Sequence, residues 1–292
     1  MANNDVYTKV FGAIVDEMEK GNAPWVRPFK GSRMPHNAAS GRRYSGGNVF
    51  ALWFAAMDKG YKENGWVTFK QAQASGCMVR KGEKGTAVYY MSKVEKKNAE
   101  DVSKKEYYFL AKFFIVFNVE QLEEVKEGAL AKLKSADTTT YKVDAVEDAD
   151  AMVAETGAVI INETNGGAWY SPARDVINMP ERDQFKGTNE YYGTLFHELT
   201  HWTGAESRCN RKLTGKFGNP DYAFEELVAE LGAAFLSSTY GMEMVSQSAA
   251  YMKNWAAACR ANPEMLARAA SLAQAAADFV TGERLAPVEA AA

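Results

Sequence analysis

The chain has 292 residues, 47% of them hydrophobic, and a net charge of −3 at pH 7, which gives it enough apolar residues for two compact domains. No apolar run is long enough to cross a bilayer, no signal-peptide pattern is present, and the three cysteines are odd in number and scattered: Cys77, Cys209 and Cys259. We therefore expect a cytoplasmic protein with reduced thiols, and neither a membrane-spanning nor a disulfide-stapled one.

The two halves of the chain carry opposite charge. Residues 1–118 contain 19 Lys and Arg against 11 Asp and Glu, a net charge of +8, whereas the remaining residues contain 15 against 26, a net charge of −11. A basic half suggests contact with a polyanion, because Lys and Arg release counterions when they neutralise phosphates. We predict an α+β protein with a DNA-binding domain over residues 1–120, a linker over 121–140 and a hydrolase-like domain over 141–292.

Basic and aromatic residues alternate in three clusters of the first half. Flat rings can stack on unpaired bases while nearby cations follow the backbone, so this mixture favours single-stranded DNA, with double-stranded DNA as the alternative partner. Strands are expected over residues 86–91 and 107–118, joined by a solvated charged connection over 93–105. The candidate DNA-binding residues are Trp25, Arg27, Arg42, Arg43, Tyr44, Asn48, Trp66, Lys70, Arg80, Lys81 and Lys84.

The most informative motif is His197-Glu198-Leu199-Thr200-His201, which follows two short strands predicted over residues 157–161 and 175–179. It lies in an amphipathic helix that is expected to begin at residue 188 or 189 and to end at residue 204. Two imidazoles four residues apart share one helix face, where both can bind one Zn²⁺ ion while Glu198 points toward the water that the metal activates. The spacing predicts a zinc hydrolase site with Glu198 as the general base.

A second helix, expected over residues 219–241, offers the third ligand. Zinc hydrolases commonly combine two histidines with a glutamate and leave the fourth position open for water. Glu226 is the candidate ligand, and Glu225 is the alternative, because an error of one residue in the helix phase would exchange the two. One turn later, Glu230 is placed to accept a hydrogen bond from the second nitrogen of a ligating histidine.

Four segments carry a family resemblance: NAASGRRYSGGN at 37–48, WVTF at 66–69, VRKGEKGT at 79–86, and HELTHWTG at 197–204 with Arg208 after it. Together they resemble the ArdC-type antirestriction proteins of conjugative plasmids, over nearly the whole chain. The resemblance implies an N-terminal single-stranded-DNA-binding domain and a C-terminal domain similar to zinc metallopeptidases of the gluzincin kind. The metal ligands that it implies are His197, His201 and Glu226, with Glu198 as general base, and the implied role is to shield incoming plasmid DNA from host restriction endonucleases.

Two alternatives stay open at this point. In the first, the protein coats DNA and its metal site is structural or vestigial. In the second, it is a DNA-dependent zinc protease that degrades proteins bound to DNA, and a peptide or protein substrate is then a further partner. Zinc is the expected cofactor, one ion per chain, and another divalent transition metal would suit the same ligands.

Overall fold

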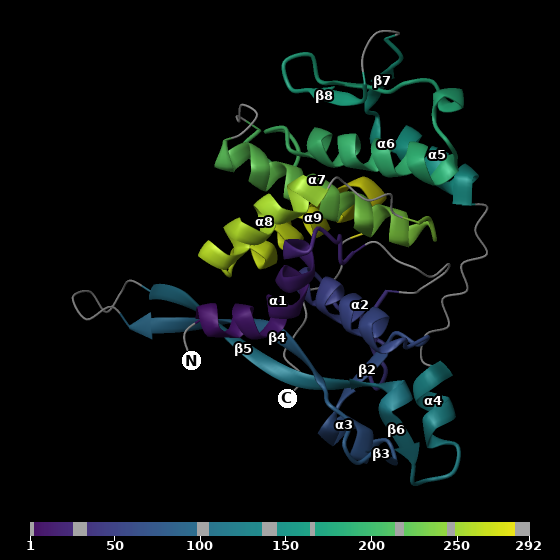
Figure 1. Cartoon of the computed structure of the whole chain (residues 1–292), viewed down its shortest axis with the longest axis vertical. Coiled ribbons are helices and arrows are strands. Elements are labelled where there is room, and N and C mark those ends of the chain that lie inside the picture. The colour runs from purple at the N-terminus through teal and green to yellow at the C-terminus, as the bar shows by residue number, and fades with distance from the viewer. Residues whose placement is uncertain are drawn as a thin grey trace.

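The computed structural model describes residues 3–25, 34–97, 105–135, 145–163, 167–213, 219–243 and 249–283. The N-terminal half is built around a four-stranded sheet with the strand order β1-β2-β5-β4 (Figure 1). Its elements are α1 (Asn3–Glu19), β1 (His36–Asn37), α2 (Gly47–Lys59), β2 (Gly65–Thr68), α3 (Phe69–Ala74), β3 (Cys77–Val79), β4 (Thr86–Lys97) and β5 (Lys105–Asn118), followed by the 3-10 turn η1 (Val119–Gln121), β6 (Leu122–Glu124) and α4 (Ala129–Ser135).

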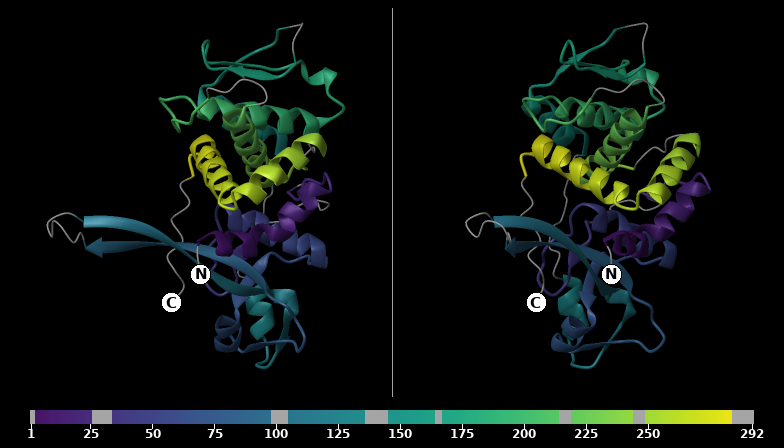
Figure 2. Two further views of the ribbon diagram at one scale, coloured as in Figure 1. Left: turned by 60° about the vertical axis from the view of Figure 1, so that its left-hand side comes forward. Right: turned by 90° about the vertical axis from the view of Figure 1, so that its left-hand side faces the viewer.

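The antiparallel hairpin of β4 and β5 projects from the body of the molecule (Figure 2). The two strands lie where the sequence predicts them, but the ladder runs from Thr86 opposite Val116 to Lys97 opposite Lys105. The expected charged connection is therefore partly strand, and residues 98–104 lie outside the described residues. Backbone hydrogen bonding does not need apolar side chains, so a charged run can continue a ladder that apolar residues have begun.

The segment predicted as a linker is largely part of the N-terminal half. Strand β6 pairs antiparallel with β3, so that Leu122 lies opposite Val79. Ala129 and Leu133 of α4 are buried in a small core together with Val67 of β2. The N-terminal half therefore extends to at least residue 135, and only residues 136–144, which lie outside the described part of the chain, remain as a connection.

In its described residues, the C-terminal half contains a small sheet and five α-helices. The elements are α5 (Ala145–Thr156), β7 (Val159–Ile161), β8 (Trp169–Ser171), β9 (Val176–Asn178), the 3-10 turn η2 (Arg182–Gln184), α6 (Thr188–Thr203), α7 (Pro220–Thr239), α8 (Ala249–Ala261) and α9 (Met265–Thr281). The two predicted strands correspond to β7 and β9, which pair in parallel, and β8 pairs antiparallel with β9. The strand order β7-β9-β8 leaves β8 at an edge of the sheet.

Both helices predicted around the metal site form within one or two residues of the expected bounds. The side chain of Asn219 accepts a hydrogen bond from the backbone N–H of Asp221 at 2.9 Å, and Pro220 occupies the first turn of α7. This cap satisfies a donor that the helix itself cannot pair, and the proline ring fixes a helical φ. Among the described residues, no helix combines the length and the apolar character that a membrane span needs.

One hydrophobic core joins the two halves. Helix α1 lies beside α8, and α2 lies beside α9 (Figure 1). Aromatic rings also meet across the two halves. The ring of Phe50 in α2 lies 4.8 Å from that of Phe235 in α7, and the ring of Trp25 lies 6.3 Å from that of Trp255 in α8, measured between centroids. The main core contains residues from both halves, so most of the apolar residues serve a shared core.

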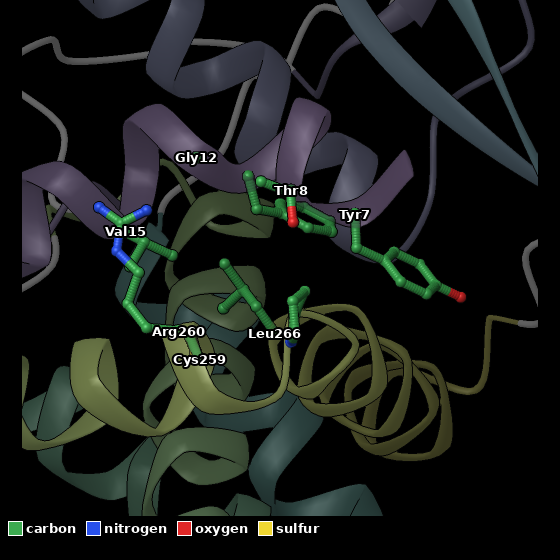
Figure 3. A pocket seen from close by; sticks show the side chains of 9 residues that line it. Tyr7, Thr8, Gly12, Val15, Cys259, Arg260 and Leu266 are labelled. Atoms are coloured by element: carbon green, nitrogen blue, oxygen red, sulfur yellow. The ribbon is translucent and has the colours of Figure 1, made fainter. Parts of the chain in front are cut away.

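A small cavity marks the junction between α1 and the turn from α8 to α9. Its volume is about 90 Å³, and Figure 3 shows Thr8 and Val15 on one side and Cys259 and Leu266 on the other. At its rim, Arg260 forms an ion pair with Glu19 at 2.8 Å and a second one with Asp16. These exposed pairs contribute little free energy by themselves, and the apolar contacts below them hold the halves together.

Candidate functional site

Helices α6 and α7 pack against each other and present three metal-ligating side chains to one point. The Nε2 atoms of His197 and His201 lie 3.2 Å apart, as expected for residues one turn apart on one face. The carboxylate of Glu226 on α7 lies 3.4 Å from Nε2 of His201 and 3.6 Å from Nε2 of His197. One ligand atom from each residue falls within 4.8 Å of the others, which gives a compact donor set.

The chemistry of this cluster fits a divalent cation. Burial by itself lowers the pKa of His197, but the facing carboxylates of Glu226 and Glu230 outweigh it and raise the pKa to about 10. Burial likewise opposes ionisation of Glu226, yet the two histidines hold its pKa well below the usual range. Two imidazoles and one carboxylate are a common ligand set for zinc and related metals, and a bound cation takes the place of the proton that the carboxylates otherwise hold on the imidazole.

Glu225 faces the outer nitrogen of one histidine. Its Oε1 atom lies 3.3 Å from Nδ1 of His201, on the opposite side of the ring from Glu226. Arg211, which is buried, donates to Glu225 at 2.8 Å, and also to the hydroxyl of Thr203 at 2.8 Å and the carbonyl of Thr200 at 2.6 Å. We infer from this arrangement that Glu226 is the metal ligand and that Glu225 orients His201.

Glu230 takes the matching position at the other histidine. Its Oε2 atom lies 3.8 Å from Nδ1 of His197. Its Oε1 atom accepts a hydrogen bond from the indole N–H of Trp25 at 3.3 Å. Each candidate histidine ligand therefore has a carboxylate beside its outer nitrogen, but the 3.8 Å separation at His197 is longer than the hydrogen bond that the sequence predicts for Glu230.

An open cleft of about 380 Å³ gives access to the cluster. Glu198, which is largely buried, lines it beside both histidines, and so do Trp169 and Tyr170 of the edge strand β8. The cleft thus brings a carboxylate, the metal-ligand cluster and a strand edge together.

Arg208 ties the edge strand to the helix that carries the histidines. Its guanidinium donates to Asp175 at 2.5 Å and to the hydroxyl of Tyr170 at 3.1 Å. It also donates to the carbonyl of Trp202 at 2.6 Å and lies over that ring, 4.0 Å from its centroid. This network fixes the wall of the cleft relative to α6.

Two residues of the site were not predicted from the sequence. Tyr222 lines the cleft, and burial together with the carboxylate of Glu226 raises the pKa of the tyrosine. Tyr222 stands four residues before Glu226, so the helix period could have found it. Arg211 lies in an irregular segment between the two helices, where no periodic signal exists.

The candidate DNA-binding residues fall into exposed and buried groups. The cations are mostly on the surface: Arg42, Lys70, Arg80, Lys81 and Lys84 are exposed, and Arg43 is half-buried. Arg80 is paired with Glu83 at 2.8 Å. Arg27 lies outside the described residues. The surface of the N-terminal half therefore keeps a basic character.

The predicted base-stacking role of the two tryptophans is wrong for this conformation. Trp25 is 2% exposed in the core between the halves, and Trp66 is fully buried in the sheet. Tyr44 is also buried, which raises its pKa to about 12. The side-chain amide of Asn48 donates a hydrogen bond to the backbone carbonyl of Tyr89 and accepts one from its backbone N–H. Large rings gain about 1.5–3 kcal/mol from burial, which explains why they pack into the core instead of facing solvent.

A different aromatic residue is available on the surface. Phe69 is 44% exposed and Ile115 is 37% exposed, and the ring of Phe117 contacts Phe69 at 6.5 Å between centroids. The turn that precedes β4 lies against the same place, because a Cβ atom on Gly85 would clash with Ile115. We call these three apolar residues, with the neighbouring exposed Lys70 and Lys84, the Phe69 patch.

Comparison with known proteins identifies the family. Residues 4–134 match the N-terminal domain of the anti-restriction factor ArdC, and residues 147–272 match a zincin-like metallopeptidase family. The metal-free crystal structure of the antirestriction protein ArdC from plasmid R388 superimposes with a TM-score of 0.77 at 35% identity, covering 94% of this chain and 96% of that one. The chain belongs to the ArdC family.

One further crystal structure and two further proteins are also similar to this chain. The Mn(II)-bound structure of the R388 protein matches with a TM-score of 0.75 at 34% identity, covering 94% of this chain and 97% of that one. The uncharacterized protein y4eC of Sinorhizobium fredii is 30% identical and is covered over 92% of its length by 96% of this chain. The DNA primase TraC of Escherichia coli is 35% identical over 94% of this chain, but the chain spans only 27% of that primase.

Proposed function

We propose that this protein is an antirestriction factor of the cytoplasm that binds DNA, preferentially single-stranded, and protects incoming plasmid DNA from host restriction endonucleases. We further infer that its zincin-like domain is a zinc-dependent peptidase site with Glu198 as general base. The observation that carries the proposal is the cluster of His197, His201 and Glu226 at the base of an open cleft, in a chain of the ArdC family.

The residues around the cleft suit hydrolysis of a peptide bond. A divalent metal held by the two histidines and Glu226 would supply Lewis-acid polarisation of a carbonyl and lower the pKa of water. Glu198 would accept the proton of the attacking water and pass it to the leaving amine. The edge strand β8 offers unpaired backbone groups along the cleft wall, so an extended peptide can add to it.

The open cleft favours this reading over a structural or vestigial metal site. A structural site is closed by four protein ligands, whereas within the described part of this chain three candidate ligands converge beside a cavity large enough for part of a substrate. The second candidate function, a DNA-dependent protease that acts on DNA-bound proteins, would use the same cleft. The two candidate functions differ only in the protein that the peptidase cuts.

The Phe69 patch supports the DNA-binding part of the proposal. It combines an exposed ring with two exposed lysines, Lys70 next to Phe69 and Lys84 next to Gly85 in the chain, and single strands are bound by rings that stack on bases and cations that follow the backbone. The exposed Arg42 and Lys81 add positive charge to the same half of the protein.

The test is Glu198→Gln in a conjugation assay with a restricting recipient. The variant keeps the size of the side chain and the candidate ligands, so metal and DNA binding should survive while peptide hydrolysis falls steeply. Unchanged protection would mean that DNA occupancy is sufficient, and lost protection would make proteolysis part of the mechanism. The antirestriction proposal fails if the wild-type protein neither binds single-stranded DNA nor raises the transfer of unmodified plasmid.

A further inference from the structure

The two candidate histidine ligands are supported from different halves of the protein. The series from His201 to Glu225 to Arg211 lies wholly in the C-terminal half. The series from His197 to Glu230 ends on Trp25, which is 205 residues away from Glu230 in the sequence. The N-terminal half therefore reaches the metal cluster through one indole N–H.

The carboxylate of Glu230 needs the partner that Trp25 provides. Glu230 is 2% exposed, so water does not solvate it. A buried carboxylate that lacks a donor costs free energy or takes up a proton. Among the described residues, the indole N–H of Trp25 is the one group with a hydrogen bond to this side chain, and Nδ1 of His197 faces its other oxygen at 3.8 Å.

The indole is itself held in place. Its ring contacts Phe50 of α2 at 6.5 Å and Trp255 of α8 at 6.3 Å between centroids, so it is wedged between helices of the two halves. An indole N–H is a donor with no acceptor, so it occupies one acceptor site of the Glu230 carboxylate and fixes how that side chain lies beside His197. In this position the carboxylate faces Nδ1 of His197 at 3.8 Å, which leaves Nε2 of that ring for a metal.

We propose that Trp25 is a positioning residue of the metal centre: it holds Glu230 toward His197 and so raises metal affinity from the N-terminal half. The inference rests on the proposed metal site. Thermodynamic reciprocity adds a consequence, because a metal that binds more tightly with Trp25 in place must also stabilise the packing of Trp25 at the junction.

The experiment measures metal affinity of the full-length protein by competition with a chelator, for Zn²⁺ and for Mn²⁺. Trp25→Phe keeps an aromatic ring and removes the donor, and it should weaken binding by about 10- to 100-fold, as loss of an outer-shell partner does. Trp53→Phe is the matched control, because Trp53 is buried in the same core against Phe50 and Phe235. It should keep wild-type affinity while lowering the unfolding temperature of the metal-free protein to a similar extent.

A double-mutant cycle shows whether Trp25 acts through Glu230. Glu230→Gln should weaken metal binding, and adding Trp25→Phe to it should cause little further loss. Fully additive losses, or equal affinities of Trp25→Phe and the wild type, would overturn the inference. His197→Ala separates it from the underlying proposal: if the wild type binds no more metal than this variant, the metal site itself is wrong.

Discussion

At the scale of single residues, the site depends on protons shared between imidazoles and carboxylates. The pKa of His197 is raised from its ordinary value of 6.5 to about 10 by Glu226 and Glu230, so protonation of this ring stabilises the metal-free fold. That contribution is complete below about pH 6.5 and is lost as the pH rises through the raised pKa. We expect the unfolding temperature of the metal-free protein to fall between pH 7 and pH 10, measured by circular dichroism.

The same proton makes metal binding depend on pH in the opposite direction. A metal must displace it, so apparent affinity should rise over the same range and binding should release protons, measurable by calorimetry in two buffers. His197→Ala should flatten the stability profile of the metal-free protein. A stability that rises with pH in the metal-free wild type would contradict the assignment of the shared proton.

The adjacent residues Glu225 and Glu226 should behave differently on substitution. Glu226→Ala removes a candidate ligand and a partner of the protonated His197, so it should abolish tight metal binding and weaken the pH dependence of metal-free stability. Glu225→Ala leaves the guanidinium of Arg211 buried without its carboxylate, which should destabilise the fold by about 3 kcal/mol. Chemical denaturation and metal titration of both variants distinguish the two roles, and an exchange of the two results would mean that Glu225 is the ligand.

The Phe69 patch gives a further prediction at this scale. Phe69→Ala should weaken binding of single-stranded DNA by about 1–3 kcal/mol, with little change in its salt dependence, because stacking releases no counterions. Lys70→Ala and Lys84→Ala should instead reduce the salt slope. Val125→Ala serves as the control, because Val125 is a 68% exposed apolar residue outside the patch. Fluorescence anisotropy at several salt concentrations measures both quantities.

At the scale of elements, the distance between α6 and α7 sets the geometry of the cluster. Gly232 of α7 lies against Thr200 of α6, and a Cβ atom there would come within 2.5 Å of the threonine side chain. Thr200 stands directly before His201 in the histidine motif, so this close contact between the two helices lies beside the candidate ligands. A glycine is required at this contact because any larger residue pushes the helices apart.

Gly232→Ala should therefore affect both stability and metal affinity. Overpacking of a core costs about 1–3 kcal/mol, and the wider spacing should move Glu226 away from the two histidines. Gly12→Ala is the matched control, because Gly12 lies in α1 with nothing within 4 Å of an added Cβ atom, and it should stabilise the helix by up to about 1 kcal/mol. Thermal unfolding and metal titration report the two effects, and unchanged metal affinity in Gly232→Ala would contradict this account.

At the scale of the whole molecule, the shared core makes the two halves one folding unit. Aromatic residues of α2 and α7 interlock, with Phe50 and Phe235 in contact, and ion pairs of Arg260 join α8 to α1. Separation of the halves would expose these rings to water, at a free energy of roughly 25 cal/mol for each Å² of apolar surface. The Phe69 patch and the candidate metal cluster therefore lie in two halves that share one hydrophobic core.

We expect the chain to unfold in a single transition. Far-ultraviolet circular dichroism and tryptophan fluorescence should give the same midpoint, and saturating Zn²⁺ should raise that midpoint for both probes, because a ligand that binds only the native state stabilises the whole cooperative unit. Two separated transitions, with only the later one shifted by metal, would show that the halves fold independently.

The sequence by itself determined the elements whose information is local. The spacing of His197 and His201, the cap formed by Asn219 and Pro220, and the apolar runs over residues 86–91 and 107–118 are local patterns. They predicted the two helices of the candidate metal site and the two strands of the hairpin. Local chemistry is sufficient there because a helix period or a cap depends on residues only a few positions apart.

Only the tertiary structure decided which side chains face one another across the fold. Trp25 and Trp66 are buried, although the sequence predicted that both bind DNA, and the indole N–H of Trp25 donates to Glu230 instead. The tertiary structure also paired Glu225 with Arg211, a contact that the sequence analysis did not predict. Which side chains are buried and which contact each other depends on how distant segments pack their apolar surfaces together, and a pattern among neighbouring residues cannot predict that packing.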